Sequence, residues 1–199
     1  MGAGSSFWFQ GSYTQGALSY IGLGSYGQAN TFYRFDGNTV GAAWGLDGIF
    51  NGQSGVELTS GASVGGGLEH YWTNDFSSTV FSNFSYIDYS GTAKNWFCSS
   101  PLGPIRTAAG GIPTFVTGAV PGCDPSFSLL QVGVRTNWNP YPNLDVGLQL
   151  AYQRLNTAFD ARTVRLSFFG AAGLPVGLFP PTDEDIWSAT VRIQRNFWP

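Results

Sequence analysis

Long segments of this chain alternate strictly between apolar and polar residues, and this alternation restricts the possible folds more than any other feature. From Leu144 to Tyr152 every second residue is apolar, and the residues between them are Asp, Gly, Gln and Ala. A period of two is typical of a β-strand whose two faces meet different surroundings. The segment extends to residue 155, which makes it about twice as long as an average strand. The sequence therefore predicts a long strand with two chemically distinct faces.

Further segments show the same period. Strands are predicted at residues 5–14, 56–72, 77–89, 130–138, 144–155 and 187–197, and a hairpin arm around residues 40–50 would raise their number from six to eight. No segment shows helical periodicity. Residues 73–76 and 140–143 read as tight turns, whereas residues of about 15–55, 90–125 and 156–185 read as long loops rich in Gly and Pro. This alternation of short and long connections predicts an all-β, antiparallel up-and-down sheet with two unequal ends.

The composition indicates that this sheet lies in a membrane. Charged residues make up 11% of the 199 residues, against about 25% in ordinary soluble domains, and there is a single lysine. Polar residues interrupt every apolar run before it reaches the roughly 20 residues of a spanning helix. A bilayer core admits only helices and closed barrels, because it offers backbone groups no hydrogen-bond partner. We therefore expect residues 1–199 to form one domain of an antiparallel transmembrane β-barrel, with long external loops and short periplasmic turns.

Alternate positions along each predicted strand form two sets, which we call its two parities. The chemistry of each set predicts whether its residues meet water or lipid. Large polar side chains of one parity suit a water-filled lumen, and the expected pore-lining residues are Glu69, Gln131, Arg135, Asn137, Asp145, Gln149, Arg192 and Gln194. The two arginines of this set would select solutes by charge, or simply bridge neighbouring strands. Aromatic residues gather at strand ends as in membrane-interface girdles, and the expected interface residues are Trp72, Trp138, Tyr152, Trp187 and Phe197. Lipid and lipopolysaccharide of a bacterial outer membrane, together with small hydrophilic solutes, are the expected partners.

Two other functions fit the alternation. A soluble, secreted β-sandwich that binds a ligand would carry the same pattern with the apolar residues inside. The shortage of lysine, the aromatic strand ends and the number of long loops weigh against it. A structural or adhesive outer-membrane barrel with a plugged interior would have the same wall as a channel, and only ion conductance separates the two.

The sequence does not predict an enzyme, a cofactor or a metal site. His70 is the only histidine, so neither a Ser-His-Asp triad nor a histidine metal cluster is possible. Residues 22–27 match G-x-G-x-x-G, but no helical pattern follows them, as a dinucleotide site requires. Residues 183–185 form an acidic run that we interpret as a solvated rim. A net charge of −3 argues against nucleic acid as a partner.

The two cysteines, Cys98 and Cys123, lie in one of the long loops. An even pair is consistent with a disulfide in an exported protein, and the spacing differs from the C-x-x-C of redox enzymes. A bridge over this ring of about 26 residues would stabilise the fold by on the order of 3 kcal/mol, because it restricts the unfolded loop. Two free thiols are the other interpretation.

Five segments together carry a family resemblance: Glu69–Thr73, Gly122–Phe127, Gln131–Pro140, Asn143–Gly147 and Trp187–Pro199. They resemble the C-terminal part of alphaproteobacterial outer-membrane porins of the Bradyrhizobium type. The resemblance implies a 16-stranded barrel, a homotrimer and passive diffusion of small hydrophilic solutes. Members of this family are about twice as long and begin with a signal peptide. The resemblance therefore also implies that N-terminal strands, and the inward-folded loop that narrows such pores, are missing from this chain.

Overall fold

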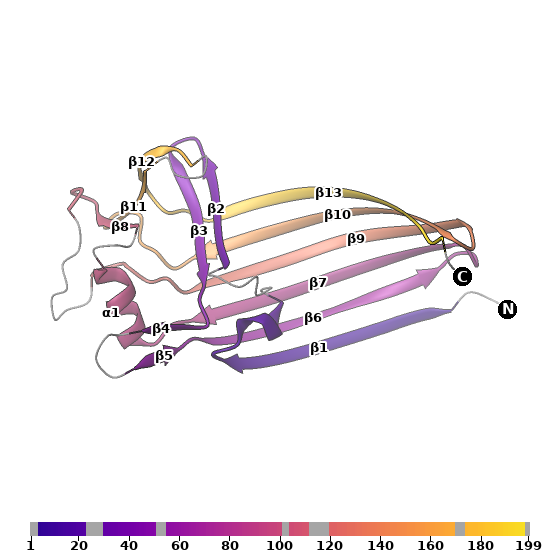
Figure 1. The fold of residues 1–199 in the computed structure, drawn as a ribbon, viewed down its shortest axis with the longest axis horizontal. Helices are drawn as coiled ribbons and strands as arrows, with labels where there is room; N and C mark the ends of the chain where they lie inside the picture. Colours follow the sequence, from indigo (N-terminus) through magenta and orange to yellow (C-terminus); the bar gives the residue numbers. More distant parts are fainter. Residues whose placement is uncertain are drawn as a thin grey trace.

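The chain folds around one long antiparallel sheet of six strands (Figure 1). The computed structural model describes residues 4–22, 30–50, 55–100, 104–111, 120–169 and 174–197. In sheet order the long strands are β1 (Ser5–Gln15), β6 (Ser60–Tyr71), β7 (Phe76–Asp88), β9 (Phe127–Tyr141), β10 (Leu144–Thr157) and β13 (Glu184–Arg195). Every neighbouring pair is antiparallel. The expectation of an all-β, antiparallel fold is therefore confirmed.

The connections alternate in length as the sequence predicts. Tight turns join β6 to β7 and β9 to β10 at one end of the sheet, which we call the turn end (Figure 1). The three long connections lie together at the opposite end, the loop end. The predicted turn at residues 140–143 is too long, because β9 continues to Tyr141 and only residues 142–143 remain for the turn. The predicted strand at residues 56–72 is also divided, because it bends at Thr59 into a short β5 (Val56–Leu58) and the long β6.

The hairpin expected around residues 40–50 forms, but it does not extend the long sheet. Instead, β2 (Asn30–Asp36) and β3 (Thr39–Gly45) pair only with each other, and β4 (Gly48–Phe50) pairs with β5. The prediction of eight strands is therefore wrong for the long sheet. The backbone of Val40 explains this, since it bonds to Pro180 and Thr182 in the connection before β13 rather than to a long strand.

The long loops contain more structure than the sequence predicts. A nine-residue helix, α1 (Gly91–Ser99), begins after Ser90, whose hydroxyl accepts a hydrogen bond from the Ala93 amide at 3.1 Å. The absence of helices was therefore wrongly predicted, because so short a segment holds too few turns to display a period. A 3-10 turn, η1 (Leu18–Ile21), follows β1. A small sheet joins β8 (Ile105–Thr107), β11 (Val164–Phe169) and β12 (Val176–Phe179).

These loop elements form a cap that holds the buried core of the molecule. One cluster joins side chains from η1 and α1 to the last inward residues of the long strands: Leu18, Ile21, Ala43, Ile49, Ile87, Tyr89, Ala93, Phe127 and Leu155. A second cluster lies between the hairpin and the small sheet: Val40, Ala42, Trp44, Cys98, Ile105, Cys123, Phe159, Val164, Leu166 and Phe168. The buried core thus lies at the loop end, where it includes the last inward residues of the long strands.

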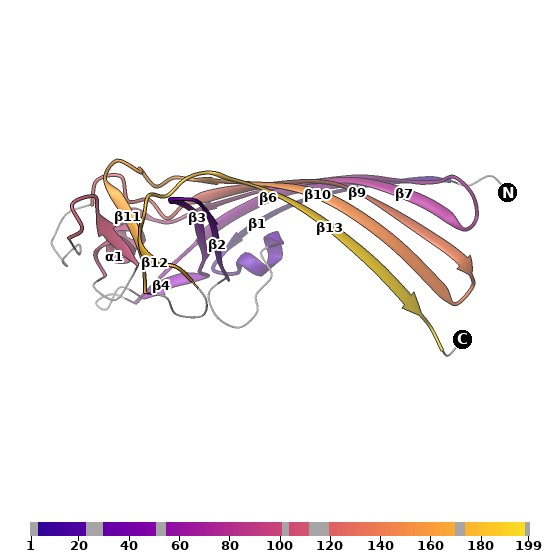
Figure 2. The same cartoon turned by 90° about the horizontal axis from the view of Figure 1, so that it is seen from above.

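The long sheet is twisted and open. Within the described residues, β1 and β13 have no pairing partner on their outer sides, so six strands form a wall and not a closed ring. Figure 2 shows the sheet nearly edge-on, with the β2–β3 hairpin and η1 on one side of it. The turn-end half of β13 bends towards that same side.

Candidate functional site

One face of the long sheet is apolar and bare. The register brings the apolar positions of neighbouring strands to one face, and Leu148 lies opposite Thr136 on β9 and Val191 on β13. Leu148 is 45% exposed, Val191 is 68% exposed and Phe7 on β1 is 73% exposed. The other exposed apolar members of this outer face include Phe9, Val64, Leu68, Val80, Phe84, Val132, Val134, Leu150, Trp187 and Ile193. Apolar surface on this scale marks contact with lipid or with another protein.

The opposite face is polar, and we call it the inner face. One row across five strands contains Glu69, Thr79, Arg135, Gln149 and Thr190. The next row towards the turn end joins Ser77 and Asn137 to Gly147 and Arg192. All eight residues expected to line a pore lie on this face, as do their neighbours Ser63, Asn83 and Gln153.

Aromatic side chains on the inner face lie against glycines. A Cβ atom at Gly67 would lie 2.8 Å from three ring atoms of Trp8 on the neighbouring strand. The Phe81 ring covers Gly133 in the same way one strand further on. Covering of strand glycines by a neighbouring aromatic is a known device that fixes register in curved sheets. These glycines are therefore explained by packing of the wall rather than by ligand binding.

The cap covers the loop end of the inner face. Leu18 and Ile21 of η1 contact the position of Gly61 on β6, and the Ser85 hydroxyl on β7 donates to the Ile21 carbonyl at 3.1 Å. On the neighbouring strands, inward positions that are polar further down become apolar and buried, as at Phe127 and Leu155. The alternation along single strands does not predict this inward packing, because the segments that meet lie far apart along the chain.

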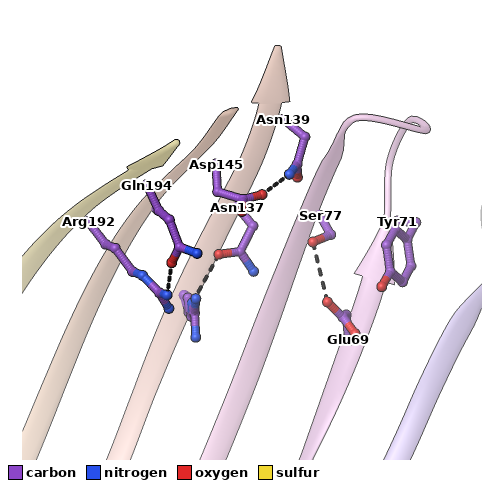
Figure 3. A pocket seen from close by; sticks show the side chains of 10 residues that line it. Glu69, Tyr71, Ser77, Asn137, Asn139, Asp145, Arg192 and Gln194 are labelled. Carbon is purple, nitrogen blue, oxygen red and sulfur yellow. Dashed lines mark hydrogen bonds between the residues drawn. The ribbon is translucent and has the colours of Figure 1, made fainter. Parts of the chain in front are cut away.

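A polar pocket of about 290 Å³ lies on the inner face near the turn end (Figure 3). Its lining comes from β6, β7, β9, β10 and β13: Glu69, Tyr71, Ser77, Arg135, Asn137, Asn139, Asp145, Gly147, Arg192 and Gln194. The register explains this convergence, because the same two rows of the ladder supply most of the lining. At Gly147 the wall has no side chain, so the pocket reaches the backbone between its polar neighbours.

Amide and hydroxyl groups hold the charged side chains of the pocket. Arg135 donates from Nε to the Asn137 side chain at 3.0 Å, and Arg192 donates to Gln194 on its own strand. Each carboxylate likewise accepts from a neutral group.

Ser77 donates to Glu69 at 3.3 Å, and the Asn139 amide donates to Asp145 (Figure 3). The described part of the chain gives none of these four charges an ion pair within 4.0 Å. Two cations and two anions therefore share one pocket without neutralising each other directly.

The structure brings together six of the eight residues expected to line a pore. Glu69, Arg135, Asn137, Asp145, Arg192 and Gln194 line the pocket. Gln131 and Gln149 share the inner face but lie outside the pocket lining.

Sequence reasoning missed Tyr71, Ser77, Asn139 and Gly147. Parity alone assigns all four to the inner face. Only the register between strands, which the sequence does not show, brings them to the pocket.

The expected interface aromatics lie on or beside the outer face. Trp72, Trp138 and Trp187 are exposed, and Tyr152 contacts Trp187 with their ring centroids 5.0 Å apart. Phe197 is exposed beyond the end of β13. Trp72 and Trp138 lie at the turn end, and Tyr152 and Trp187 lie at the loop end, so the aromatic residues occur at both ends of the bare apolar face.

Cys98 and Cys123 form a disulfide inside the second core cluster. The bridge joins α1 to the segment that precedes β9, so it closes the connection between β7 and β9. Lys94 of α1 reinforces the same connection, with Nζ 3.1 Å from Asp88 and 2.9 Å from Asp124. Despite the cost of burial, hydrogen bonds from Lys94 and Ser126 hold the pKa of Asp124 below its usual value.

The acidic run at residues 183–185 divides between two surfaces. Asp183 and Asp185 face Arg154 on the outer side, at 3.8 and 3.6 Å. Glu184 is instead 6% exposed, and its Oε2 lies 3.3 Å from Nε of Arg34 in the hairpin. The other carboxylate oxygen has no hydrogen-bond partner among the described residues, and burial raises the pKa of Glu184. The interpretation of this run as a solvated rim is therefore wrong for Glu184, which anchors the hairpin to the wall.

Comparisons with protein-family models, with curated proteins and with solved structures find no match for this chain. In the parts of the chain that the structure describes, no helix combines the length and the hydrophobicity that crossing a bilayer requires. The two faces of the long sheet and the polar pocket therefore carry the functional conclusion.

Proposed function

We propose that the long sheet is part of the wall of a passive diffusion channel in a bacterial outer membrane. The outer face meets the hydrocarbon of the bilayer, and the inner face lines a water-filled lumen through which small hydrophilic solutes pass. The free edges of β1 and β13 pair with further strands and close the barrel, because unpaired backbone groups are not tolerated in lipid. Contact with lipopolysaccharide, a total of 16 strands and assembly as a homotrimer belong to the same proposal.

The observation that carries this proposal is the bare apolar face opposite a polar one. In a soluble sandwich the apolar side chains of the long sheet would pack in the interior, whereas Leu148, Val191 and Phe7 are all strongly exposed. A lumen also accounts for the inner face, because Arg135 and Arg192 line a polar pocket on the side of the wall that a lumen would occupy. The strands, of 11 to 15 residues, are also long enough to cross a bilayer at a tilt.

A non-conducting barrel is the second candidate, and the cap favours it. Because the β2–β3 hairpin and η1 pack against the inner face, they lie on the side of the wall where the lumen would run (Figure 2). The polar pocket at the turn end favours conduction, since a purely structural wall has no need of four separate charges.

Two measurements test the proposal in sequence. The first measures quenching by brominated lipids in vesicles, using variants that retain only one tryptophan. We expect strong quenching of Trp187 on the outer face and weak quenching of Trp8 on the inner face. Equal quenching of the two would contradict the assignment of the faces.

The second measurement is conductance across a planar bilayer. Stepwise currents support the channel, and their absence for protein that passes the quenching test favours the non-conducting barrel.

A further inference from the structure

The polar pocket contains opposite charges that are kept apart. Glu69 and Arg135 lie in the same row of the sheet with Thr79 between them. Their Cα atoms are therefore separated by two strand spacings, about 10 Å. Arg192 lies on the far side of Gly147 from Asn137, so the two arginines approach the pocket from β9 and β13. The two arginines therefore lie on β9 and β13, Glu69 lies on β6, and Asp145 lies on β10 between the strands of the arginines.

Each charged group retains capacity for a ligand. A guanidinium has five N–H donors in a fork that matches a carboxylate, and the structure assigns one side-chain acceptor each to Arg135 and Arg192. Glu69 accepts from Ser77 and interacts with the Tyr71 hydroxyl, and its carboxylate has further lone-pair positions. Gly147 lines the pocket between Asn137 and Arg192, and a Cβ atom there would lie 3.3 Å from the Asn137 side chain. The volume of about 290 Å³ is at the lower limit for organic ligands and suits a molecule of a few heavy atoms.

We propose that this pocket binds small zwitterions of the α-amino acid class. The ligand carboxylate binds to the guanidinium groups of Arg135 and Arg192, and the ligand ammonium binds to Glu69. Asp145 lies on the strand between the two arginines and balances the total charge of the pocket. The formal charges of these four side chains cancel, which matches a ligand of zero net charge. This inference rests on the proposed function in one respect: it names the class of solute that the proposed channel would favour.

The other ligand classes fit less well. A simple anion would gain from the two arginines but would face two carboxylates in the same pocket, and like charges held close together are unfavourable. A simple cation would gain from the two carboxylates but would face the two arginines in the same pocket. A zwitterion satisfies both kinds of charge at once. Its binding must also be weak enough for release, as conduction through a pore requires.

The experiment compares three probes of similar size on the full chain refolded in deuterated detergent micelles: glycine, acetate and methylammonium. Broadening of each probe's own proton signals during titration yields its affinity without any conductance. We expect glycine to bind at least tenfold more tightly than acetate or methylammonium. We also expect Arg192→Gln, Arg135→Gln and Glu69→Gln each to weaken glycine binding at least tenfold.

Arg195→Gln is the matched control, because Arg195 lies on the outer face of the same strand as Arg192. It should leave glycine binding unchanged. Two outcomes would overturn the proposal in favour of an anion site. In one, acetate binds as tightly as glycine; in the other, Glu69→Gln leaves glycine binding intact. Folded protein that binds none of the probes would also overturn it. Conductance without glycine binding refutes this inference alone, whereas glycine binding without conductance refutes the channel and not the pocket.

Discussion

A lysine at position 148 is the most direct test of the two faces. Leu148 lies four residues from Tyr152 and four from Leu144, which pairs with Tyr141. The eight residues between these aromatic levels span about 27 Å of strand, or about 21 Å along the membrane normal at a tilt of about 40°. This is close to the apolar band of about 25 Å in outer-membrane barrels. Leu148 therefore lies near the middle of the hydrocarbon in the proposed orientation.

In that position Leu148→Lys should lower the free energy of unfolding by about 2–4 kcal/mol, the cost of a lipid-facing cation at the midplane. The neighbouring change, Gln149→Lys, places the same charge on the inner face. It should lower the free energy of unfolding by less than about 1 kcal/mol, which arises from repulsion by Arg135 in the same row. The two variants introduce the same side chain at adjacent positions of one strand, one on each face.

The assay is urea unfolding of the chain folded into phosphatidylcholine vesicles, followed by tryptophan fluorescence. If Leu148→Lys changes stability by less than about 0.5 kcal/mol, it behaves as a surface residue in water, and the lipid-facing assignment fails. Equal losses for the two variants would refute the assignment as well. The same outcome would remove the main support for a channel.

Three further predictions concern the cap. Burial raises the pKa of Glu184, so the folded state favours the protonated carboxyl. The contribution of this protonated group to stability is full below the unfolded pKa and is lost as pH rises through the folded pKa. Glu184→Gln should therefore gain stability relative to the parent as pH rises from 4 to 8 in urea titrations, and a constant difference would contradict this. Reduction of Cys98–Cys123 should lower the free energy of unfolding of the cap by about 3 kcal/mol, measured by urea titration with and without dithiothreitol. An unchanged midpoint would show that the bridge constrains little. Ser90→Ala removes the helix cap of α1 and should cost about 1 kcal/mol, whereas Ser90→Gly should cost only a few tenths.

The sequence predicted the long strands well because their two faces meet different surroundings for a dozen residues at a time. Leu144 to Leu155 shows the period directly, and β10 has almost these bounds. Parity also assigned Arg135 and Arg192 to one face. Their meeting in one pocket depends on register, which is fixed by pairing between strands and leaves no trace in the spacing along a single strand.

The cap escaped prediction for a different physical reason. Its elements are short, and its buried residues come from segments separated by more than a hundred positions, such as Ala43 and Leu155. Side chains of helix α1 and of the β2–β3 hairpin are buried in the two core clusters. These tertiary contacts stabilise the two elements, and neither has a periodic pattern of its own. Glu184 shows the same limit, because an acidic run gives no indication that its middle member turns inward to meet Arg34.

In the proposed channel, the position of the buried core at the loop end divides the molecule between two solvents. The cap excludes water by packing its own side chains together, whereas the bare apolar face of the long strands would depend on the bilayer. Urea dissolved in the aqueous phase would reach the cap directly, but it would reach the lipid-facing strands only when they leave the bilayer. In that arrangement we expect the cap to unfold at lower urea concentrations than the wall, with the disulfide and the Arg34–Glu184 ion pair limiting how far its segments separate.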